Sequence, residues 1–559
     1  MKKITLFAIL CLGAQANAQI RVGIESNSQY YLDDKKIKIE PNEAEDRFRS
    51  NNYIKVDYSL KNFEFGVQAE GYLPKAILNY NPDLIDFNIG AVYARYNNYE
   101  KGIDITAGHI YEQFGSGLAL RFWEDRALGI NNSLFGGRVK LRIADAANIK
   151  MLAGKQRVGM GFDLSDGTVY GADAEIDVAQ VINSDNLGLK VGASYVGKYE
   201  NLSELYPTIP RTTDVFGPRV DFTSNAFNLN VEYLYKTESI HVENMKVFGN
   251  TLRNGNALLL NAGFNSSNFG VNLNTRRVEN FGFFSQSNMA GNVFNYGMIN
   301  YVPSLVKQYD HSLQNIYVYQ ALNKMTFDDT REKLGEIGGQ FDMFFQVPEG
   351  TLLGGKTGAY FAVNGSYWAG LKNDVVYAED EYGWQYVQDL KSSSVFGFGT
   401  KAYSDFGVEY RKTFNDKLSA IFSYLNQYYN SDFLEGKGYS IKSNIIAAEA
   451  TYFLSEMKSI RLELQHMWAD HDKKNWAGGT IEYTPNQTWS VFLHDMYNYG
   501  NDLESQRLHY YNFGGAYSKG ATRIAASYGR QRGGMICVGG VCRYVPESNG
   551  FTLNLTTNF

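Results

Sequence analysis

The chain closes with the stretch Phe551-Thr552-Leu553-Asn554-Leu555-Thr556-Thr557-Asn558-Phe559, which alternates between two faces of a strand. Chain ends usually fray and are polar, so an aromatic last residue is unusual for a soluble domain. In an outer-membrane barrel, the closing strand presents one face to lipid and ends on an interfacial aromatic. We interpret the stretch as a closing strand and an assembly signal for the barrel assembly machinery, the alternative being an edge strand of a soluble sandwich. The signal residues are Phe551, Leu553, Leu555 and Phe559.

The N-terminal residues predict export from the cytoplasm. Met1-Lys2-Lys3 is a short basic region, Ile4–Leu12 is an apolar core, and Ala16-Asn17-Ala18 is a small-x-small cleavage site. We therefore expect residues 1–18 to be a signal peptide cleaved after Ala18 and residues 19–559 to form the mature protein. The apolar core is too short for a membrane helix, and no other stretch approaches the roughly 20 apolar residues that such a helix needs.

Composition favours a membrane-embedded barrel over a helical membrane protein. Aromatic residues make up 15% of the chain, with 41 Tyr and 35 Phe, yet the mean hydropathy is −0.33. Half of each barrel strand faces a polar interior, which lowers hydropathy, and Tyr suits the membrane interface. The formal charge of −6 argues against nucleic acid as a partner. We expect the outer-membrane lipid of a Gram-negative cell to surround the protein.

Strand-like alternation recurs along nearly the whole chain, as in Ile54–Leu60, Phe63–Leu73 and Ser459–Trp468. A soluble antiparallel sheet gives the same pattern in any single strand, so the repetition carries the prediction. We predict an all-β fold: one large antiparallel transmembrane β-barrel of roughly 24 strands, within a range of about 20 to 26. Because strand-like sequence starts at Arg21, we expect no globular plug in front of the barrel, unlike in energised transporters.

Short and long connections alternate, which predicts periplasmic N- and C-termini beside short turns, and long extracellular loops at the other end. The short turns are at Lys61-Asn62, Asn183 to Asn186, Asn415-Asp416, Ser455-Glu456, Pro485-Asn486 and Lys519-Gly520. The long connections are Asp33–Asp46, Gln113–Asn132, Asn201–Gly217, Ser239–Gly255, Gly370–Gly397 and Ser431–Ser443.

Cys537 and Cys542 flank Val538-Gly539-Gly540-Val541. Gly-Gly favours a two-residue hairpin turn, which would place the two cysteines directly opposite each other in a non-hydrogen-bonded pair. In the oxidising envelope this geometry predicts a disulfide that stiffens the last outer loop. A redox pair or a two-thiolate metal site is the alternative, although the spacing is not Cys-x-x-Cys and no His lies in the loop.

Two arginines bracket two carboxylates in Arg121-Phe122-Trp123-Glu124-Asp125-Arg126. If this cluster folds inward, Arg121, Glu124, Asp125 and Arg126 would form a charged lumen constriction. The alternative is an outer loop held by internal Arg–carboxylate pairs.

Two further stretches interrupt the strand pattern. Asn280–Glu336 alternates poorly until Pro303 and then gains strand-like character around Leu313–Tyr319. A loop of this length is uncommon unless functional, so we expect it to fold into the lumen as a plug or to contain an extra hairpin. Asp374–Asp389 is acidic and aromatic, and we interpret it as a solvated loop or as a surface for sugars, cations or a protein.

Enzyme signatures are weak. His494-Asp495 and the group His466, Asp470, His471 and Asp472 are the local candidates for an acid–base dyad. Adjacent strand residues point to opposite faces, so His494 and Asp495 cannot cooperate directly. We predict no enzymatic activity, no cofactor and no metal site.

Several motifs resemble a family of Bacteroidota outer-membrane proteins of unknown function, over the whole mature chain. The resemblance implies the lineage and the location and carries over no activity. The motifs are Gly115-Ser116-Gly117-Leu118, Glu124-Asp125-Arg126-Ala127-Leu128-Gly129-Ile130, Asn300-Tyr301-Val302-Pro303 and Cys537-Val538-Gly539-Gly540-Val541-Cys542-Arg543-Tyr544-Val545-Pro546.

Two functions fit these observations. The first is a non-enzymatic barrel that acts as an accessory subunit of an envelope machine for outer-membrane protein assembly or surface export. Such a subunit would hold envelope protein partners through its extracellular loops, and lumen-filling segments favour it. The second is a passive, porin-like channel for small polar solutes, a common role of large barrels.

Overall fold

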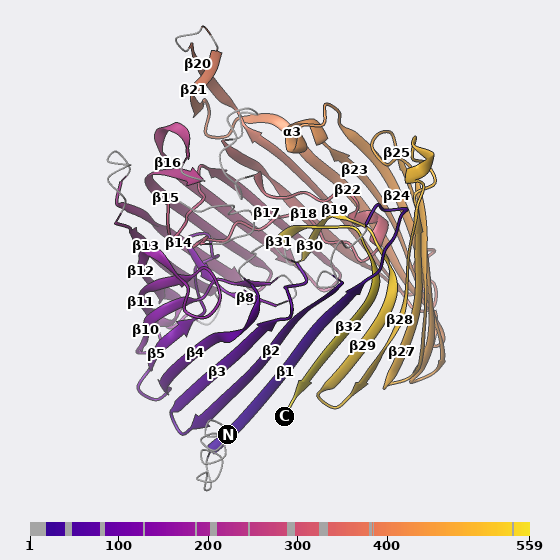
Figure 1. Cartoon of the computed structure of the whole chain (residues 1–559), viewed down its shortest axis with the longest axis horizontal. Coiled ribbons are helices and arrows are strands. Elements are labelled where there is room, and N and C mark those ends of the chain that lie inside the picture. Colours follow the sequence, from indigo (N-terminus) through magenta and orange to yellow (C-terminus); the bar gives the residue numbers. More distant parts are fainter. Residues whose placement is uncertain are drawn as a thin grey trace.

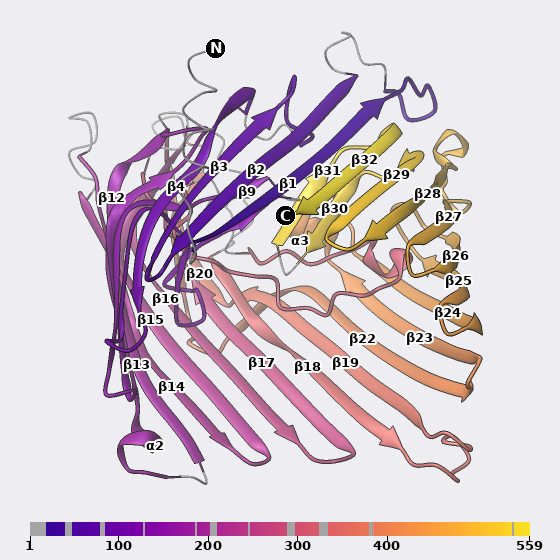
Figure 2. The same cartoon turned by 90° about the horizontal axis from the view of Figure 1, so that it is seen from below.

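The computed structural model describes residues 18–559 except 40–46, 79–83, 127–128, 185–186, 202–209, 244–245, 288–296, 323–333, 380–382, 384 and 539–540. These residues form a closed antiparallel barrel of 24 strands (Figures 1 and 2), so the predicted fold class and strand number are confirmed. Of the predicted signal peptide, residues 1–17 lie outside the described residues.

The barrel closes where its first and last strands pair. β1 (Ala18–Tyr31) and β32 (Ser548–Asn558) are antiparallel, with Tyr30 opposite Phe551 and Gly23 opposite Asn558. The Phe559 amide donates to the Val22 carbonyl oxygen at 2.8 Å, which extends the seam beyond the last strand residue. Closure leaves no edge strand with unpaired backbone groups, as a sheet in lipid requires.

The other barrel strands follow in chain order, each paired with its neighbours along the wall. They are β2 (Phe48–Leu60), β3 (Phe63–Tyr72), β4 (Asp86–Asn98), β5 (Ile103–Ile110), β10 (Leu134–Ile143), β11 (Ala147–Arg157), β12 (Leu164–Asp177), β13 (Leu187–Tyr199), β14 (Thr212–Ser224), β15 (Phe227–Glu243), β16 (Lys246–Asn265), β17 (Phe269–Glu279), β18 (Gly335–Val347), β19 (Ala359–Leu371), β22 (Phe398–Asn415), β23 (Leu418–Tyr429), β24 (Ile441–Ser455), β25 (Lys458–Ala469), β26 (Trp476–Asn486), β27 (Trp489–Tyr497), β28 (His509–Lys519) and β29 (Thr522–Gln531).

The two faces of each strand differ as the alternation predicts. In β3, Phe65 and Val67 are 45% and 50% exposed on the outside, whereas Gln68 and Glu70 are buried on the inside. β25 repeats the pattern, with Leu464 outside and Glu463 inside. The wall is a single sheet, so a side chain that does not face the lumen faces the surroundings of the barrel. Large apolar side chains are exposed on this outer face all around the wall, which marks a lipid-facing band.

The connections at the two ends of the barrel differ. The turn end carries both termini (Figure 1) and five of the six predicted short turns, each within about two residues of its expected place. The connection predicted as a short turn at Asn183 to Asn186 is longer, because α2 (Val178–Val181) lies between β12 and β13. Residues 185–186 of this connection lie outside the described residues. At one of these turns Gly520 has φ +58°, a conformation that favours glycine. The opposite loop end carries the longest connection, between β17 and β18.

One predicted loop is wrong. Ser239–Gly255 is not a long connection, because β15 continues to Glu243 and β16 starts at Lys246. The paired backbone extends beyond the part of the wall where one face must be apolar. The side-chain alternation that identifies a strand therefore fades there while the backbone pairing continues. The hairpin that results stands at the loop end (Figure 1).

The remaining strands and helices are short. They are β6 (Glu112–Phe114), β7 (Leu120–Phe122), β8 (Glu124–Asp125), β9 (Ile130–Asn131), β20 (Asn373–Glu379), β21 (Gln385–Ser392), β30 (Gly534–Val538), β31 (Val541–Val545), α2 (Val178–Val181), α3 (Ser431–Glu435) and the 3₁₀ turns η2 (Ser312–Asn315) and η5 (Glu504–Gln506). Among the described residues, no helix has the length and apolar character to cross a bilayer.

The closing strand provides a matched test of the wall. Leu553 faces outward in β32 at 49% exposure, and the next residue, Asn554, faces the lumen. Leu553→Arg should reduce barrel stability by about 2–4 kcal/mol, because a cation on the lipid face is costly near the bilayer midplane. Asn554→Arg, the control, should change stability little. Heat-modifiable gel mobility and denaturant unfolding measure both, and equal effects would contradict the assigned faces.

Candidate functional site

An apolar core lies inside the lumen, where a water-filled pore would be polar. Nine consecutive wall strands, β5 and β10–β17, each direct at least one buried apolar side chain inward. Val196 and Val215 are direct cross-strand neighbours, and so are Leu234, Ala257 and Val278 across three strands. All five are fully buried. These side chains form a continuous apolar patch on the inner wall.

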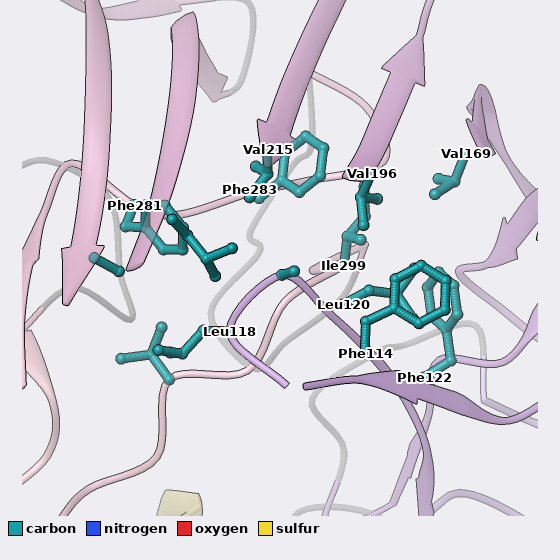
Figure 3. Close-up of a cluster of buried hydrophobic side chains, with 14 of the residues drawn as sticks. Phe114, Leu118, Leu120, Phe122, Val169, Val196, Val215, Phe281, Phe283 and Ile299 are labelled. Atoms are coloured by element: carbon teal, nitrogen blue, oxygen red, sulfur yellow. The ribbon is translucent and has the colours of Figure 1, made fainter. Parts of the chain in front are cut away.

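Two inner loops cover this patch. We call residues 111–133 inner loop 1 and residues 280–322 inner loop 2. From the first come Phe114, Leu118, Leu120 and Phe122, and from the second come Phe281, Phe283, Ile299 and Val302. Figure 3 labels all of these side chains except Val302, and shows them beside Val169, Val196 and Val215. The result is a dry core between the loops and the wall, packed as in a globular protein.

Backbone hydrogen bonds join the two loops to each other. The Arg121 amide donates to the Ile299 carbonyl oxygen at 2.8 Å, and the Tyr301 amide donates to the Gly117 carbonyl oxygen at 3.0 Å. Within inner loop 2, the Ile299 amide donates to the Phe283 carbonyl oxygen at 2.8 Å. Buried backbone N–H and C=O groups need hydrogen-bond partners. The two loops supply such partners to each other without forming long strands.

Inner loop 2 continues across the lumen to the opposite wall and fills a second core there. Leu313, Ile316, Tyr317 and Tyr319 pack on inward-facing residues of β19 and β22–β28, and Leu305 contacts both cores. The described residues of the predicted stretch Asn280–Glu336 therefore fold into the lumen. The prediction of strand-like structure around Leu313–Tyr319 is wrong, because this part contains the 3₁₀ turn η2. It forms a row of apolar side chains that pack on the wall.

Aromatic stacking and a buried carboxylate fix the end of this row. The Tyr319 ring stacks on Trp368 and on Tyr403, each with ring centroids 5.6 Å apart. The Tyr319 hydroxyl donates to Glu336 Oε2 at 2.6 Å, and Glu336 also pairs with Arg276. Burial and the neighbouring Glu336 charge raise the pKa of Tyr319 well above its usual value, so the hydroxyl stays a donor.

A second carboxylate fixes the start of inner loop 2. Glu200 Oε2 accepts hydrogen bonds from the Ser287 amide and the Ser287 hydroxyl, both at 2.8 Å. The Lys198 ammonium lies 2.9 Å from the same carboxylate. Inner loop 2 is thus held to the wall by charge-assisted hydrogen bonds at two distant points.

The predicted constriction residues lie within inner loop 1, against the wall. The Arg121 guanidinium sits 4.8 Å from the Trp123 ring centroid and 4.1 Å from that of Tyr301. The Arg126 guanidinium donates to Glu25 Oε2 at 3.1 Å and is 3.4 Å from Glu124 Oε2.

Burial alone would lower the pKa of Arg126, but Glu124 and Glu25 outweigh it and raise the pKa. Arg126 thus has one ion pair inside the cluster, with Glu124, and one with Glu25 of β1. Arg121, at the other end of the cluster, contacts two aromatic rings. Asp125 pairs through its backbone with Ile130.

Polar cavities remain beside the inner loops. One of about 330 Å³ lies below Gly115 and is lined by charges of both signs, among them Asp104, Lys140, Asp173 and Arg219. Another of about 470 Å³ separates inner loop 2 from β27–β29. Its lining includes Lys307, Tyr309, His494, Tyr510 and Arg530.

The cysteine hairpin has the predicted register. Cys537 is paired with Cys542 across β30 and β31, and a disulfide joins them. The turn residues Gly539 and Gly540 lie outside the described residues. The hairpin also contacts inner loop 2, because Cys542 Sγ lies 3.6 Å from the Tyr319 carbonyl oxygen and Arg532 donates to the Asn315 carbonyl oxygen at 3.4 Å. This contact with the plug was not expected from the sequence.

Of the histidines named as acid–base candidates, His471 lies beside a carboxylate of its own group, with Nδ1 3.2 Å from Asp470 Oδ1. The other two have different partners. His494 Nδ1 lies 2.8 Å from Thr480 Oγ1 on the lumen side, and Asp495 lies 2.7 Å from His509 Nδ1 on the other face of β27. The sequence did not indicate the pair of Asp495 with His509, since it forms across two strands. His466 Nε2 lies 2.7 Å from the Tyr499 hydroxyl.

The acidic and aromatic stretch Asp374–Asp389 forms much of the hairpin β20–β21, which projects from the loop end (Figure 1). Its residues Asp380, Glu381, Tyr382 and Trp384 lie outside the described residues. We refer to this hairpin as the outer arm.

The whole chain, residues 1–559, matches the family DUF6029, described as a family of unknown function. The chain belongs to this family. No curated protein sequence matches it.

Solved structures of outer-membrane barrels align along nearly the full chain at low identity. The siderophore receptor PirA from Pseudomonas aeruginosa is 9% identical, with a TM-score of 0.39, over 98% of this chain and 81% of the receptor. The P pilus usher PapC translocation pore is 8% identical, with a TM-score of 0.41, over 96% of this chain and 99% of the pore. OprD from Pseudomonas aeruginosa is 9% identical, with a TM-score of 0.33, over 98% of this chain and 96% of OprD.

The hairpin disulfide should be present in the purified mature protein. Cys537 and Cys542 should resist alkylation until a reductant is added, as peptide mass mapping would show. Replacing both with Ser should lower stability by no more than about 2 kcal/mol, because the closed loop is short. Free thiols in the native protein would contradict the observed pairing.

Proposed function

We propose that this DUF6029 protein is a closed, non-enzymatic outer-membrane barrel that acts as an accessory subunit of an envelope machine for outer-membrane protein assembly or surface export. The observation that carries the proposal is the dry core between the inner loops and the wall. A diffusion channel needs a wetted path, whereas here the loops bury the apolar inner wall. In this proposal, the predicted signal peptide directs export into a Bacteroidota envelope, and the loop end faces the outside.

The cost of opening supports a closed lumen. Moving inner loop 2 would expose Phe281, Phe283, Ile299 and Val302 together with the wall residues that they cover. Burying one such side chain contributes about 1.5–3 kcal/mol, so exposing several of them together is far costlier than the motion of a surface lid. A partner subunit needs the barrel as a rigid frame, and the proposed recognition surface is the loop end with the outer arm.

The passive channel remains the second candidate, and the polar cavities favour it. Charges of both signs line the cavity below Gly115, and cations with aromatic residues line the one beside β27–β29. If water connects these cavities with a third one, of about 270 Å³ and lined by Glu124, the pure protein conducts, and Arg121→Gln or Glu124→Gln shifts its ion selectivity.

Planar bilayer recordings separate the two functions. The pure wild-type protein should conduct poorly, although an open bore of this size would exceed that of 16- to 18-stranded porins. Replacing residues 284–319 with a short Gly/Ser linker should open a large conductance. The wall should survive, since β17 and β18 already pair at Glu279 and Gly335.

Replacing residues 375–390 of the outer arm with the same linker is the matched control, because its flanks Asn373 and Ser392 are paired outside the lumen. This control should remain closed. Large conductance of the wild-type protein, with selectivity that follows Arg121 or Glu124, would contradict the closed barrel and favour the channel.

The accessory role predicts copurification. Gentle detergent extraction from the native host should recover envelope proteins with the wild-type barrel, and the linker variant of the outer arm should recover fewer of them. Quantitative mass spectrometry measures the difference, with Leu353→Ser in the β18–β19 turn as a control at the opposite end. A wild-type protein that purifies alone under these conditions would contradict the accessory role.

A further inference from the structure

A histidine of inner loop 2 meets two carboxylates of the wall in the described part of the chain. His311 precedes η2, Glu449 lies on β24 and Glu463 lies on β25. His311 Nε2 is 3.6 Å from Glu449 Oε2, and the three side chains offer ligand atoms that all lie within 4.8 Å of one another. His311 is only 3% exposed, so bulk water does not solvate its ring.

The orientation of the ring leaves one nitrogen without a hydrogen bond. His311 Nδ1 lies 3.1 Å from Gln314 Oε1, an oxygen that can only accept, so this nitrogen carries the proton. Nε2 is buried and has no hydrogen-bond partner among the described residues, since Glu449 Oε2 lies 3.6 Å away. In the neutral ring its lone pair then points toward negatively charged oxygens, an arrangement that a cation between them would stabilise.

The excess of negative charge around the ring also favours a bound cation. Arg461 pairs with Glu449 at 3.0 Å, with Glu463 at 2.5 Å and with Glu482 at 3.5 Å. One guanidinium therefore faces three carboxylates. A second positive charge beside these carboxylates is therefore favoured.

We propose that His311, Glu449 and Glu463 bind a divalent transition metal ion of the Zn²⁺ class, which clamps inner loop 2 to the barrel wall. One imidazole and two carboxylates are ligands that Zn²⁺ accepts, with the fourth position left to water. With bonds of about 2.0–2.2 Å, two ligands of a tetrahedral Zn²⁺ lie about 3.4 Å apart. The Nε2 to Oε2 distance of 3.6 Å is close to this separation. Ca²⁺ and Mg²⁺ prefer all-oxygen sites, so the imidazole disfavours them.

The groups that would orient a metal-bound His311 are already in place. Gln314, which orients the ring, also donates from Nε2 to Ser423 Oγ at 3.2 Å and accepts at its backbone oxygen from Gln427 at 3.2 Å. Such outer partners fix the tautomer of a metal-bound histidine. Gln314 is thus a positioning residue for the site.

Zinc binding to the purified full-length barrel tests the proposal. After treatment with a chelator and its removal, isothermal titration with Zn²⁺ should show one site per chain. His311→Ala and Glu463→Gln should weaken this binding by roughly 100-fold or more, and Gln314→Ala by about 10- to 100-fold. His509→Ala is the matched control, because it removes a histidine that also faces a carboxylate, Asp495, but lies on the outer face. This control should bind as the wild type does.

Spectroscopy and barrel integrity complete the test. Co²⁺ in place of Zn²⁺ should give visible absorption bands in the wild type and in His509→Ala, and none in His311→Ala. Heat-modifiable gel mobility shows that each variant retains its barrel. Absence of Zn²⁺ binding by the intact wild type, or equal binding by His311→Ala, would overturn the site and leave a protonated histidine as the cation. Neither result depends on whether the barrel conducts.

Discussion

Apolar contact between the inner loops and the lumen wall is the interaction on which the rest of this structure depends. A closed wall of 24 strands encloses a space too wide for its own side chains to fill. Water could occupy the space only if the inner wall were polar, but β5 and β10–β17 present an apolar patch there. The inner loops must cover this patch, and the covered patch in turn determines where the loops lie.

The polar groups of the lumen have a different role from the apolar ones. Burial of apolar side chains stabilises the filled state without selecting one arrangement, since it is not directional. Glu200, Glu336 and the pairing of the two loops through Arg121 and Tyr301 are directional, so they set the register of the loops on the wall. A metal ion at His311 would add a third fixed point, between the two carboxylate anchors in sequence.

Much of the wall could be predicted from the sequence, because strand alternation is a local signal. Phe63–Leu73 and Ser459–Trp468 repeat with a period of two, and short turns such as Lys519-Gly520 separate the strands. The alternation failed at the loop end, in Ser239–Gly255, although the backbone of β15 and β16 remains paired there. The Gly-Gly turn likewise sufficed to predict the pairing of Cys537 with Cys542.

The candidate site was less accessible to sequence reasoning, because it consists of contacts between distant segments. Val196 and Val215 face the lumen, and their neighbours Tyr195 and Phe216 face outward. Both faces of the wall are therefore apolar at this place. The alternation along the sequence does not show which segment covers the inner face. His311 carried no signal, since Glu449 and Glu463 lie far away in sequence. Poor alternation in Asn280–Glu336 predicted a lumen plug or an extra hairpin, but it did not indicate which wall residues the segment covers.

Hydrogen–deuterium exchange of the intact barrel in detergent measures whether the inner loops are a permanent part of the core. The amides of Arg121, Ile299 and Tyr301 donate between or within the inner loops and belong to no wall strand. These amides should exchange as slowly as wall amides, since only sub-global opening would expose them. Rapid exchange of these amides in a barrel whose strands remain protected would show that the inner loops are not a fixed part of the core.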